Sequence, residues 1–367
     1  MRLPVRDGDA AKIDEPEAIK MIRYAIDHGV NYVDTAYGYH RGNSEFLVGK
    51  VLQDGYREKV RLATKMPTWL VNSQKDMDKY LNEQLGKLQV DHVDFYLLHG
   101  LNKERWPKLK QLDVFGWAER KIREGKIGHL GFSFHDEYPI LKEIMDSYDR
   151  WTLCQIQYNY MDTDYQAGTK GLRYAASKGL AVVVMEPIAG GKLAIKPPRE
   201  IQALWDKSNL KTTPASLALR WVWNQPEVSI ALSGMSTLQQ VMENVETANV
   251  SGPDTLSKEE QELVTQLVTA YKGLGFIGCT GCRYCVPCPQ GVNIPQIFSF
   301  YNEYFVRDRD DAIKNKYWEH ITPESQAKRC ARCKRCEELC PQRLPIPELL
   351  SKAAQLFEQD LPQRAAR

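Results

Sequence analysis

The chain has 367 residues, with 49 lysines and arginines against 47 aspartates and glutamates, and a formal net charge of +2. This length favours one large domain joined to a smaller one. The balanced charge does not indicate a nucleic-acid partner, and no apolar run approaches the ~20 residues needed to span a bilayer. Composition therefore predicts a soluble protein with neither a nucleic-acid nor a membrane partner.

Residues 1–14 predict a polar loop. They combine Pro4 and Gly8 with charged side chains, among them Arg2, Arg6, Asp7 and Asp9. Proline and charge are unsuited to the interior of a buried strand. A helix is expected to begin near Asp14, because Pro16 then falls in its first turn.

From there to about residue 250, short apolar runs alternate with amphipathic segments. The runs that predict strands are 31–34, 60–65, 93–99, 128–132, 153–157, 180–186 and 228–232. The segments that predict helices are 17–28, 44–53, 74–88, 111–124, 138–148, 168–178, 213–224 and 237–247. Strands that alternate with helices indicate βα units around a parallel sheet.

The number of strands favours a closed arrangement. Seven visible strands in a domain of this size favour an α/β fold of the (β/α)₈ TIM-barrel type over an open doubly wound sheet. In a complete barrel a strand should precede the loop at 1–14. The sequence contains no such strand, so we predict that the first strand is missing. We therefore predict seven central strands, with a gap between the strand ending at Asp34 and the strand ending at Leu232.

Four titratable residues stand at or just after the carboxyl ends of three predicted strands: Asp34, Tyr39, Lys65 and His99. In a barrel these ends share one mouth, where catalytic residues lie. An ammonium next to a phenol lowers the phenol's pKa, and a carboxylate can hold that ammonium. Such a group suits a general acid for carbonyl reduction. The alternative is that these side chains only cap helices or loops.

A further helix is predicted over 257–274, because Ser257 and Glu260 have the spacing of a capping box. Several glycines follow this helix and loosen the chain. We place a domain boundary there, with a barrel over residues 1–274 and a small α-helical, ferredoxin-like domain over 275–367.

Eight of the nine cysteines lie in two motifs of this second domain. They are Cys279-x-x-Cys282-x-x-Cys285-x-x-Cys288-Pro and Cys330-x-x-Cys333-x-x-Cys336-x-x-x-Cys340-Pro. The second has the spacing of bacterial ferredoxins, in which the fourth cysteine binds the other cluster. We therefore predict two [4Fe–4S] clusters with crossed ligands. One set is Cys279, Cys282, Cys285 and Cys340, and the other is Cys330, Cys333, Cys336 and Cys288.

Zinc and disulfides are the alternatives for these cysteines. Structural zinc sites use two separated ligand pairs, whereas each motif here supplies four closely spaced thiolates. Disulfides require an oxidising compartment, and the N-terminus does not resemble a signal peptide. Reduced thiolates predict a cytoplasmic location. The ninth cysteine, Cys154, lies in an apolar run and is expected to be a buried core thiol.

Several segments resemble the aldo/keto reductase family, in the same order and with barrel spacing. They are Asn31-Tyr-Val-Asp-Thr-Ala-Tyr-Gly-Tyr39, Leu62-Ala-Thr-Lys65, Asp94-Phe-Tyr-Leu-Leu-His-Gly100, Gly131-Phe-Ser133 and Gly190-Gly-Lys-Leu193. The C-terminal part resembles the ferredoxin-like extension of one branch. The resemblance implies hydride transfer between a nicotinamide and an aldehyde or ketone. It makes Tyr39 the proton donor, gives the tuning of its acidity to Lys65 and Asp34, and has His99 orient the carbonyl.

The resemblance also implies cofactor contacts. Ser133 and Gln155 correspond to the residues that hold the nicotinamide carboxamide. The remaining implied contacts are Gly190, Gly191, Ser233, Gly234, Met235, Gln240 and Asn244. Gly234 and Gln240 stand where the family has lysine and arginine for the 2′-phosphate, so NADP(H) and NAD(H) both stay open. Backbone N–H groups at a helix N-terminus remain available for phosphate.

Three functional interpretations follow. The first is an oxidoreductase that acts on a small carbonyl or alcohol, with clusters that are structural or exchange electrons with an external carrier. The second is a nucleotide-sensing regulatory subunit, and the third is an iron–sulfur electron-transfer protein with an inactive barrel. The complete set of four titratable residues favours the first, because a sensor needs no proton donor.

Overall fold

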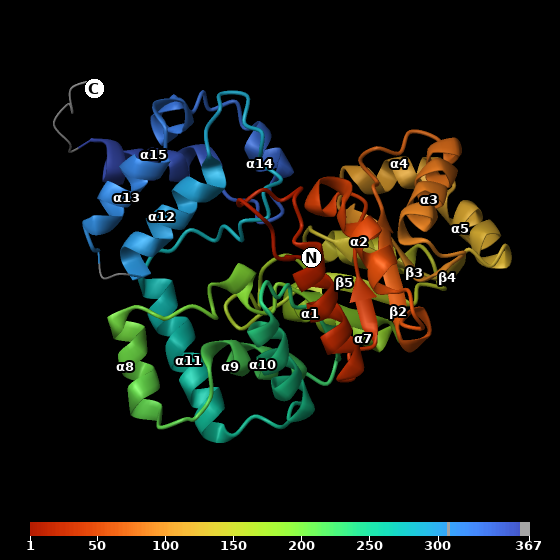
Figure 1. Cartoon of the computed structure of the whole chain (residues 1–367), viewed down its shortest axis with the longest axis horizontal. Coiled ribbons are helices and arrows are strands. Elements are labelled where there is room, and N and C mark those ends of the chain that lie inside the picture. Colours follow the sequence, from red (N-terminus) through yellow and green to blue (C-terminus); the bar gives the residue numbers. More distant parts are fainter. Residues whose placement is uncertain (307–308, 360–367) are drawn as a thin grey trace. The chain divides into compact units, whose positions relative to one another are not determined.

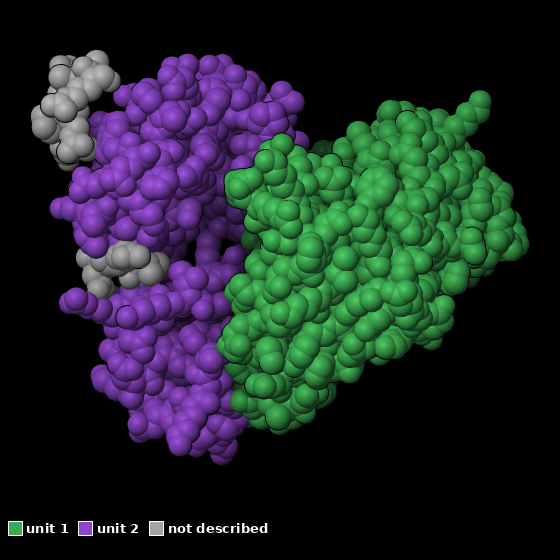
Figure 2. All heavy atoms as spheres, in the orientation of Figure 1, with its two compact units in different colours: residues 1–187, 216–256 green, residues 188–215, 257–367 purple. Residues whose placement is uncertain are grey.

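The computed structural model describes residues 1–306 and 309–359, which divide into two compact units (Figure 2). The first unit comprises Met1–Pro187 and Ser216–Leu256, and the second comprises Ile188–Ala215 and Ser257–Arg367. The units therefore divide the chain differently from a single cut between residues 274 and 275. That sequence boundary stays a prediction.

The first unit is built on one sheet of seven parallel strands, whose neighbours follow the order of the chain (Figure 1). The strands are β1 (Tyr32–Asp34), β2 (Arg61–Met66), β3 (Val93–Leu101), β4 (Ile127–Phe134), β5 (Leu153–Gln157), β6 (Ala181–Met185) and β7 (Val228–Ala231). Within the described residues, β1 and β7 are the two ends of this sheet. The predicted gap between them is confirmed.

The loop at 1–14 does not add an eighth strand to the sheet. Its one β-bridge in the described part of the chain joins Val5 to Ile13, within the loop itself. His40 holds the loop in place: its Nε2 accepts from the Leu3 N–H at 3.1 Å, and its Nδ1 lies 2.9 Å from the Ala10 carbonyl oxygen. The loop is therefore ordered without being a barrel strand, as the sequence predicts.

The helices of the barrel follow the strands. They are α1 (Glu15–Asp27), α2 (Ser44–Val51), α3 (Gln74–Leu88), α4 (Arg105–Gln111), α5 (Val114–Arg123), α6 (Tyr138–Asp146), α7 (Gly168–Ser177), α9 (Pro214–Trp223) and α10 (Leu238–Asn249). In α3, the Ser73 side chain accepts from the Asp76 N–H at the start, and Gln89 ends the helix in the left-handed conformation. Short 3₁₀ turns η1 (Tyr39–Gly42) and η2 (Arg57–Lys59) precede α2 and β2.

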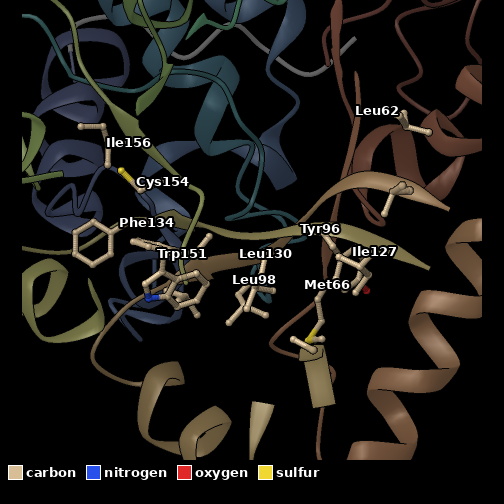
Figure 3. Packing of buried hydrophobic residues seen from close by; sticks show 14 of the residues in the cluster. Leu62, Met66, Tyr96, Leu98, Ile127, Leu130, Phe134, Trp151, Cys154 and Ile156 are labelled. Carbon is tan, nitrogen blue, oxygen red and sulfur yellow. The ribbon is translucent and has the colours of Figure 1, made fainter. Parts of the chain in front are cut away.

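The strands bury side chains on both faces. Ala63, Leu97, Leu153 and Val183 form an inner cluster contributed by four different strands. Their immediate sequence neighbours Leu62, Tyr96, Leu98 and Cys154 belong instead to the large core cluster, part of which Figure 3 shows. A filled interior with a covered exterior is the packing of a TIM barrel.

The second unit is helical throughout its described part. Its helices are α8 (Arg199–Ser208), α11 (Lys258–Gly273), α12 (Ile294–Val306), α13 (Ala312–His320), α14 (Arg335–Leu339) and α15 (Ile346–Glu358), with the short turns η3 (Ala189–Gly191), η4 (Pro323–Ser325) and η5 (Ala327–Arg329). Ser257 and Glu260 form the predicted capping box at the start of α11. None of the described helices of either unit is long and apolar enough to cross a membrane.

An apolar core orders the segments that carry the cysteines. The Phe357 ring of α15 stacks on Tyr317 of α13 with their centroids 4.5 Å apart. The carboxylate of Glu358 then accepts from the backbone N–H groups of Ala327 and Lys328, at 2.9 and 3.1 Å. These contacts fix η5 immediately before the second cysteine motif.

Candidate active site and cysteine clusters

The four predicted catalytic residues come together at one end of the sheet. Asp34 is the last residue of β1, Lys65 lies in β2 and His99 in β3. The strands are parallel and adjacent, so these positions share the same edge. Tyr39 opens η1, and its ring lies edge-on to the His99 ring with the centroids 5.9 Å apart.

Lys65 is fully buried and satisfied by neighbouring oxygens. Its Nζ donates to Asp34 Oδ2 at 2.5 Å and to the Thr35 carbonyl at 2.8 Å. A buried ammonium is tolerated only when it is paired and hydrogen-bonded in this way. The same Nζ lies 5.1 Å from the centroid of the Tyr39 ring. Asp34 therefore holds a fixed positive charge beside the phenol.

Tyr39 keeps its proton in this structure. Burial raises the pKa of its phenol, and the carboxylates of Asp34 and Glu186 raise it further, whereas Arg2 lowers it. The pKa of Tyr39 is thus raised, whereas the sequence predicts that the Lys65 ammonium lowers it. The physical reason is that desolvation of the phenolate outweighs the nearby ammonium, which directs its hydrogen bonds to Asp34 and Thr35.

His99 is an uncharged polar group in the same site. Burial lowers the pKa of its imidazole well below the usual value, and the Lys65 ammonium lowers it further. Its ring also meets Trp69 at 5.2 Å between centroids. Its Nδ1 is buried and has no hydrogen-bond partner within the described residues. A neutral imidazole of this kind can donate a hydrogen bond without carrying charge.

A buried network beneath Lys65 was not predicted from the sequence. Gln84 Nε2 donates to the Lys65 carbonyl oxygen at 3.0 Å and to Glu45 Oε1 at 2.5 Å. Thr64 and Tyr96 join through their hydroxyl groups, at 2.6 Å to Glu45 and 2.8 Å to Gln84. Glu45 lies on the buried face of α2, and a carboxylate on an otherwise apolar helix face was the available signal. The network fixes the backbone that presents Lys65.

Ser133 and Gln155 are adjacent on β4 and β5, at paired positions of the sheet. Ser133 Oγ accepts from the Gly100 N–H at 2.7 Å, which leaves its own hydrogen to donate. Gln155 Nε2 lies 3.4 Å from Asp34 Oδ1, while its buried Oε1 has no partner in the described part of the chain. One donor beside one acceptor matches the two ends of a primary carboxamide.

Arg2 and Glu186 also lie near this site and were not predicted as site residues. Arg2 Nη2 is 3.3 Å from Glu186 Oε1, and both charges act on the pKa of Tyr39. A β-carbon built on Gly234 would meet Arg2 Cγ at 2.9 Å. Arg2 is thus a cation beside the loop in which the sequence lacks lysine and arginine.

The predicted adenosine-phosphate loop precedes α10. Ser233 Oγ accepts from Asn244 Nδ2 at 3.0 Å, and Gln240 Oε1 accepts from the Ser236 N–H at 2.8 Å. Three predicted contact residues therefore brace the loop itself. Met235 lies in the same loop, partly buried against the small apolar cluster of α1 and α10.

Gly190 and Gly191, the other predicted cofactor contacts, belong to the second unit. A β-carbon on Gly190 would lie 2.9 Å from both the Cα and the carbonyl oxygen of Thr280, inside the first cysteine motif. Lys192 Nζ donates to the Ile277 carbonyl oxygen at 2.6 Å. The Gly190–Lys192 segment therefore supports the loop that carries the first cysteines.

The first predicted ligand set lines one hollow. Cys279, Cys282, Cys285 and Cys340 surround it together with Phe298, Ile346 and other side chains. The pKa of Cys285 is raised to about 12, first by burial and then by the other three thiols of this set. The fourth member thus comes from the second motif, which is the crossed arrangement predicted from the spacing.

The thiols of the second set also lie near one another. The pKa of Cys336 is raised to about 11 by burial and by the neighbouring Cys330, Cys288 and Cys333. All nine cysteines are free thiols, and the ninth, Cys154, is buried in the barrel core. The mixed composition of both sets follows from the packing of the two motifs on one helical core.

The thiols of the described residues do not converge on a single-ion site. A tetrahedral zinc with bonds of 2.3 Å would draw its sulfurs to about 4 Å from one another. Within the described residues, no three His, Cys, Asp or Glu side chains are close enough to hold one metal ion.

Comparison with known proteins supports both the barrel and the cysteine-containing domain. Residues 5–268 match the aldo/keto reductase family, and residues 278–345 match a 4Fe-4S dicluster domain. An uncharacterized oxidoreductase of Bacillus subtilis (strain 168), YrpG, is 27% identical over 65% of this chain and 84% of its own length. The NADH-specific methylglyoxal reductase of Escherichia coli (strain K12) is 26% identical over 71% of this chain and 91% of its own.

Solved structures share the barrel. The holo form of an aldo-keto reductase from Bacillus halodurans has a TM-score of 0.61 at 25% identity, over 72% of this chain and 91% of its own. An aldo-keto reductase from Klebsiella pneumoniae in complex with NADPH has a TM-score of 0.58 at 24% identity, over 73% and 89%. The chain belongs to the aldo/keto reductase family of oxidoreductases, and a 4Fe-4S dicluster domain follows its barrel.

Proposed function

We propose that the chain transfers a hydride between a nicotinamide cofactor and a small carbonyl or alcohol substrate, and that it carries two [4Fe–4S] clusters. The observation that carries the first part is the buried Lys65–Asp34 pair beside a protonated Tyr39 and a neutral His99. A positioned acid, a fixed cation and an uncharged hydrogen-bond donor are what carbonyl reduction requires.

Each residue has a distinct part in this proposal. A reduced nicotinamide, when bound, would supply the hydride for the carbonyl carbon. Tyr39 gives its phenolic proton to the carbonyl oxygen, and the Lys65 ammonium stabilises the phenolate that remains. His99 donates a hydrogen bond to the same oxygen and orients the substrate. Asp34 holds the Lys65 side chain in place through their ion pair.

The residues present fit a nicotinamide. Ser133 can donate to the carboxamide oxygen, and the unpartnered Gln155 Oε1 can accept from its NH₂ group. The two relatives named for a nicotinamide differ, one with NADPH and one with NADH. Arg2, beside Gly234, supplies a cation near the predicted adenosine-phosphate loop, so the proposed cofactor is NADP(H) or NAD(H).

The two cysteine sets fit two [4Fe–4S] clusters, which would either stabilise the fold or exchange electrons with an external carrier. Cys279, Cys282, Cys285 and Cys340 would hold one cluster, while Cys330, Cys333, Cys336 and Cys288 would hold the other. Eight thiolates that must stay reduced also support a cytoplasmic location.

The proposal is tested on anaerobically purified protein. NADH and NADPH are titrated by fluorescence, and turnover is then measured with methylglyoxal, the substrate in the name of the Escherichia coli relative, and with a panel of aldehydes and ketones. We expect saturable binding of at least one nicotinamide and its oxidation by a carbonyl compound. Binding without turnover of any carbonyl would instead support a nucleotide-sensing subunit.

A further inference from the structure

Exposed cations surround the second cysteine motif. The segment 328–336 contains Cys330, Cys333 and Cys336 and six other residues, of which five are cations: Lys328, Arg329, Arg332, Lys334 and Arg335. All five side chains are exposed, and so is the ligand Cys333 between them. We call these five residues the basic collar. In the part of the chain that the structure describes, none of the five forms an ion pair.

The conformation of the segment directs these side chains outward. Arg332 and Lys334 have φ angles of 53° and 60°, in the left-handed region that few residues other than glycine adopt. The chain therefore turns tightly on either side of Cys333. The thiols of Cys330 and Cys336 are half-buried against the core of the unit, while the intervening cations face solvent.

The first motif acts as an internal comparison. It supplies the same number of thiolates, yet among the six non-cysteine residues between Cys279 and Cys288 only Arg283 is a cation. The seven non-cysteine residues between Cys330 and Cys340 include three cations of the basic collar, together with Glu337 and Glu338. If the basic collar served merely to offset the negative charge of the thiolates, the first motif would need it equally. The local surplus also stands out against a net charge of only +2 for the chain. It therefore has a role specific to the surface around Cys333.

We propose that the basic collar is the docking surface for an acidic one-electron carrier protein, such as a flavodoxin or an acidic ferredoxin. The proposal rests on the proposed function only in requiring that the second cluster is present. Opposite charge steers diffusional encounters and speeds association, and redox partners use small, transient interfaces. The exposed Cys333 places the ligand shell of the second cluster in the middle of that interface. A nucleic acid or an anionic membrane would gain nothing from the cysteine.

The electron balance of such an encounter is simple. The reduced carrier loses one electron and the cluster gains one, and no bond forms or breaks. Two encounters supply two electrons, and a hydride formed from them would take its proton from water. The clusters would thus be reached by an outside partner through the basic collar.

The test uses anaerobic holoprotein and a photochemically reduced acidic flavodoxin as the probe. Stopped-flow absorbance follows the reduction of the clusters at increasing ionic strength. We compare the wild type with the charge-reversal variant R332E/K334E/R335E and with the neutral variant R332Q/K334Q/R335Q. The matched control K207E/K258E/K272E changes the net charge equally, at exposed lysines of α8 and α11. Iron content and reduction by dithionite show that each variant retains its clusters.

We expect the wild-type rate to fall steeply with salt, and the charge-reversal variant to be slower by roughly tenfold or more at low salt. The neutral variant should be intermediate, and the control should match the wild type. A salt-independent wild-type rate, or equal loss in the control, would overturn the proposal. The proposal would also be overturned if the charge-reversal variant kept the wild-type rate of cluster reduction but lost binding to DNA or to vesicles with anionic lipid. Failure of nicotinamide turnover, with these rates as expected, would contradict the proposed function alone.

Discussion

At the scale of single residues, removal of the phenolic proton of Tyr39 tests whether the four titratable residues are catalytic or structural. Tyr39→Phe removes the proton donor and leaves the packing of the ring. We expect carbonyl reduction to fall by about 10²-fold or more, the size of a general-acid contribution, with nicotinamide binding nearly unchanged. Tyr37→Phe is the matched control, because the Tyr37 hydroxyl donates to Glu83 at 2.9 Å. Equal turnover in the Tyr39 variant and the wild type would mean that the four residues are structural.

The pH dependence of turnover follows from the same two side chains. The raised pKa of Tyr39 keeps the phenol protonated above its usual value of 10.0, and the lowered pKa of His99 keeps the imidazole neutral below 6.5. Protonated Tyr39 and neutral His99 are the forms that the reduction needs. Carbonyl reduction should therefore show no inflection between about pH 6.5 and 9.5 in kcat/KM. A midpoint near 6.5 that disappears in His99→Gln would show that His99 titrates normally.

At the scale of elements, the Gly190–Lys192 segment is expected to support the first cluster. Gly190 and Gly191 both have positive φ angles, of 69° and 96°, so alanine strains the backbone at either site. Only Gly190 approaches Thr280, since a β-carbon on Gly191 would meet nothing within 4 Å. Gly190→Ala should therefore lose up to about half of the bound iron, the share of one of two clusters, whereas Gly191→Ala should retain it. Equal iron in both variants would mean that the contact with Thr280 is dispensable.

If each cluster takes ligands from both motifs, the iron content of a double cysteine variant should depend on whether its two cysteines bind the same cluster. The wild type should hold about eight iron and eight sulfide per chain, from two cubanes. Cys340→Ala combined with Cys279→Ala should keep about four iron, because both ligands belong to one cluster. Cys340→Ala combined with Cys330→Ala should lose nearly all of it.

The reverse pattern in these pairs would show that each motif binds its own cluster. Stoichiometric zinc without acid-labile sulfide would contradict both arrangements. Cys154→Ala serves as the control, because Cys154 is buried in the core of the barrel and should not affect iron content.

At the scale of the whole molecule, the sequence predicts what depends on local pattern. Alternating apolar runs and helices lead to the seven parallel strands and to the gap beside the loop at 1–14. Strand ends predict the meeting of Asp34, Lys65 and His99, because parallel strands share one edge. Cysteine spacing predicts the mixed thiol sets, because that spacing reflects the shape of the cluster.

The remainder depends on contacts between distant segments, which no local pattern reveals. Gln84 reaches Glu45 and Lys65 from a different helix, and Arg2 lies against Glu186 and Gly234. The sequence leads to a lowered pKa for Tyr39, whereas burial raises it. The burial of a side chain cannot be deduced from residue types alone. The packing of Gly190 on Thr280 likewise appears only once both segments are placed.

The central claim is that the barrel moves a hydride to a carbonyl carbon with Tyr39 as the acid. The most direct measurement uses NADH and NADPH with deuterium at the transferred C4 position and methylglyoxal as substrate, under anaerobic conditions. Mass spectrometry and NMR locate the label in the product. We predict one deuterium on the new carbinol carbon with the wild type, and almost no labelled product with Tyr39→Phe. Reduced product without deuterium at that carbon, or equal labelling by the Tyr39 variant, would contradict the account.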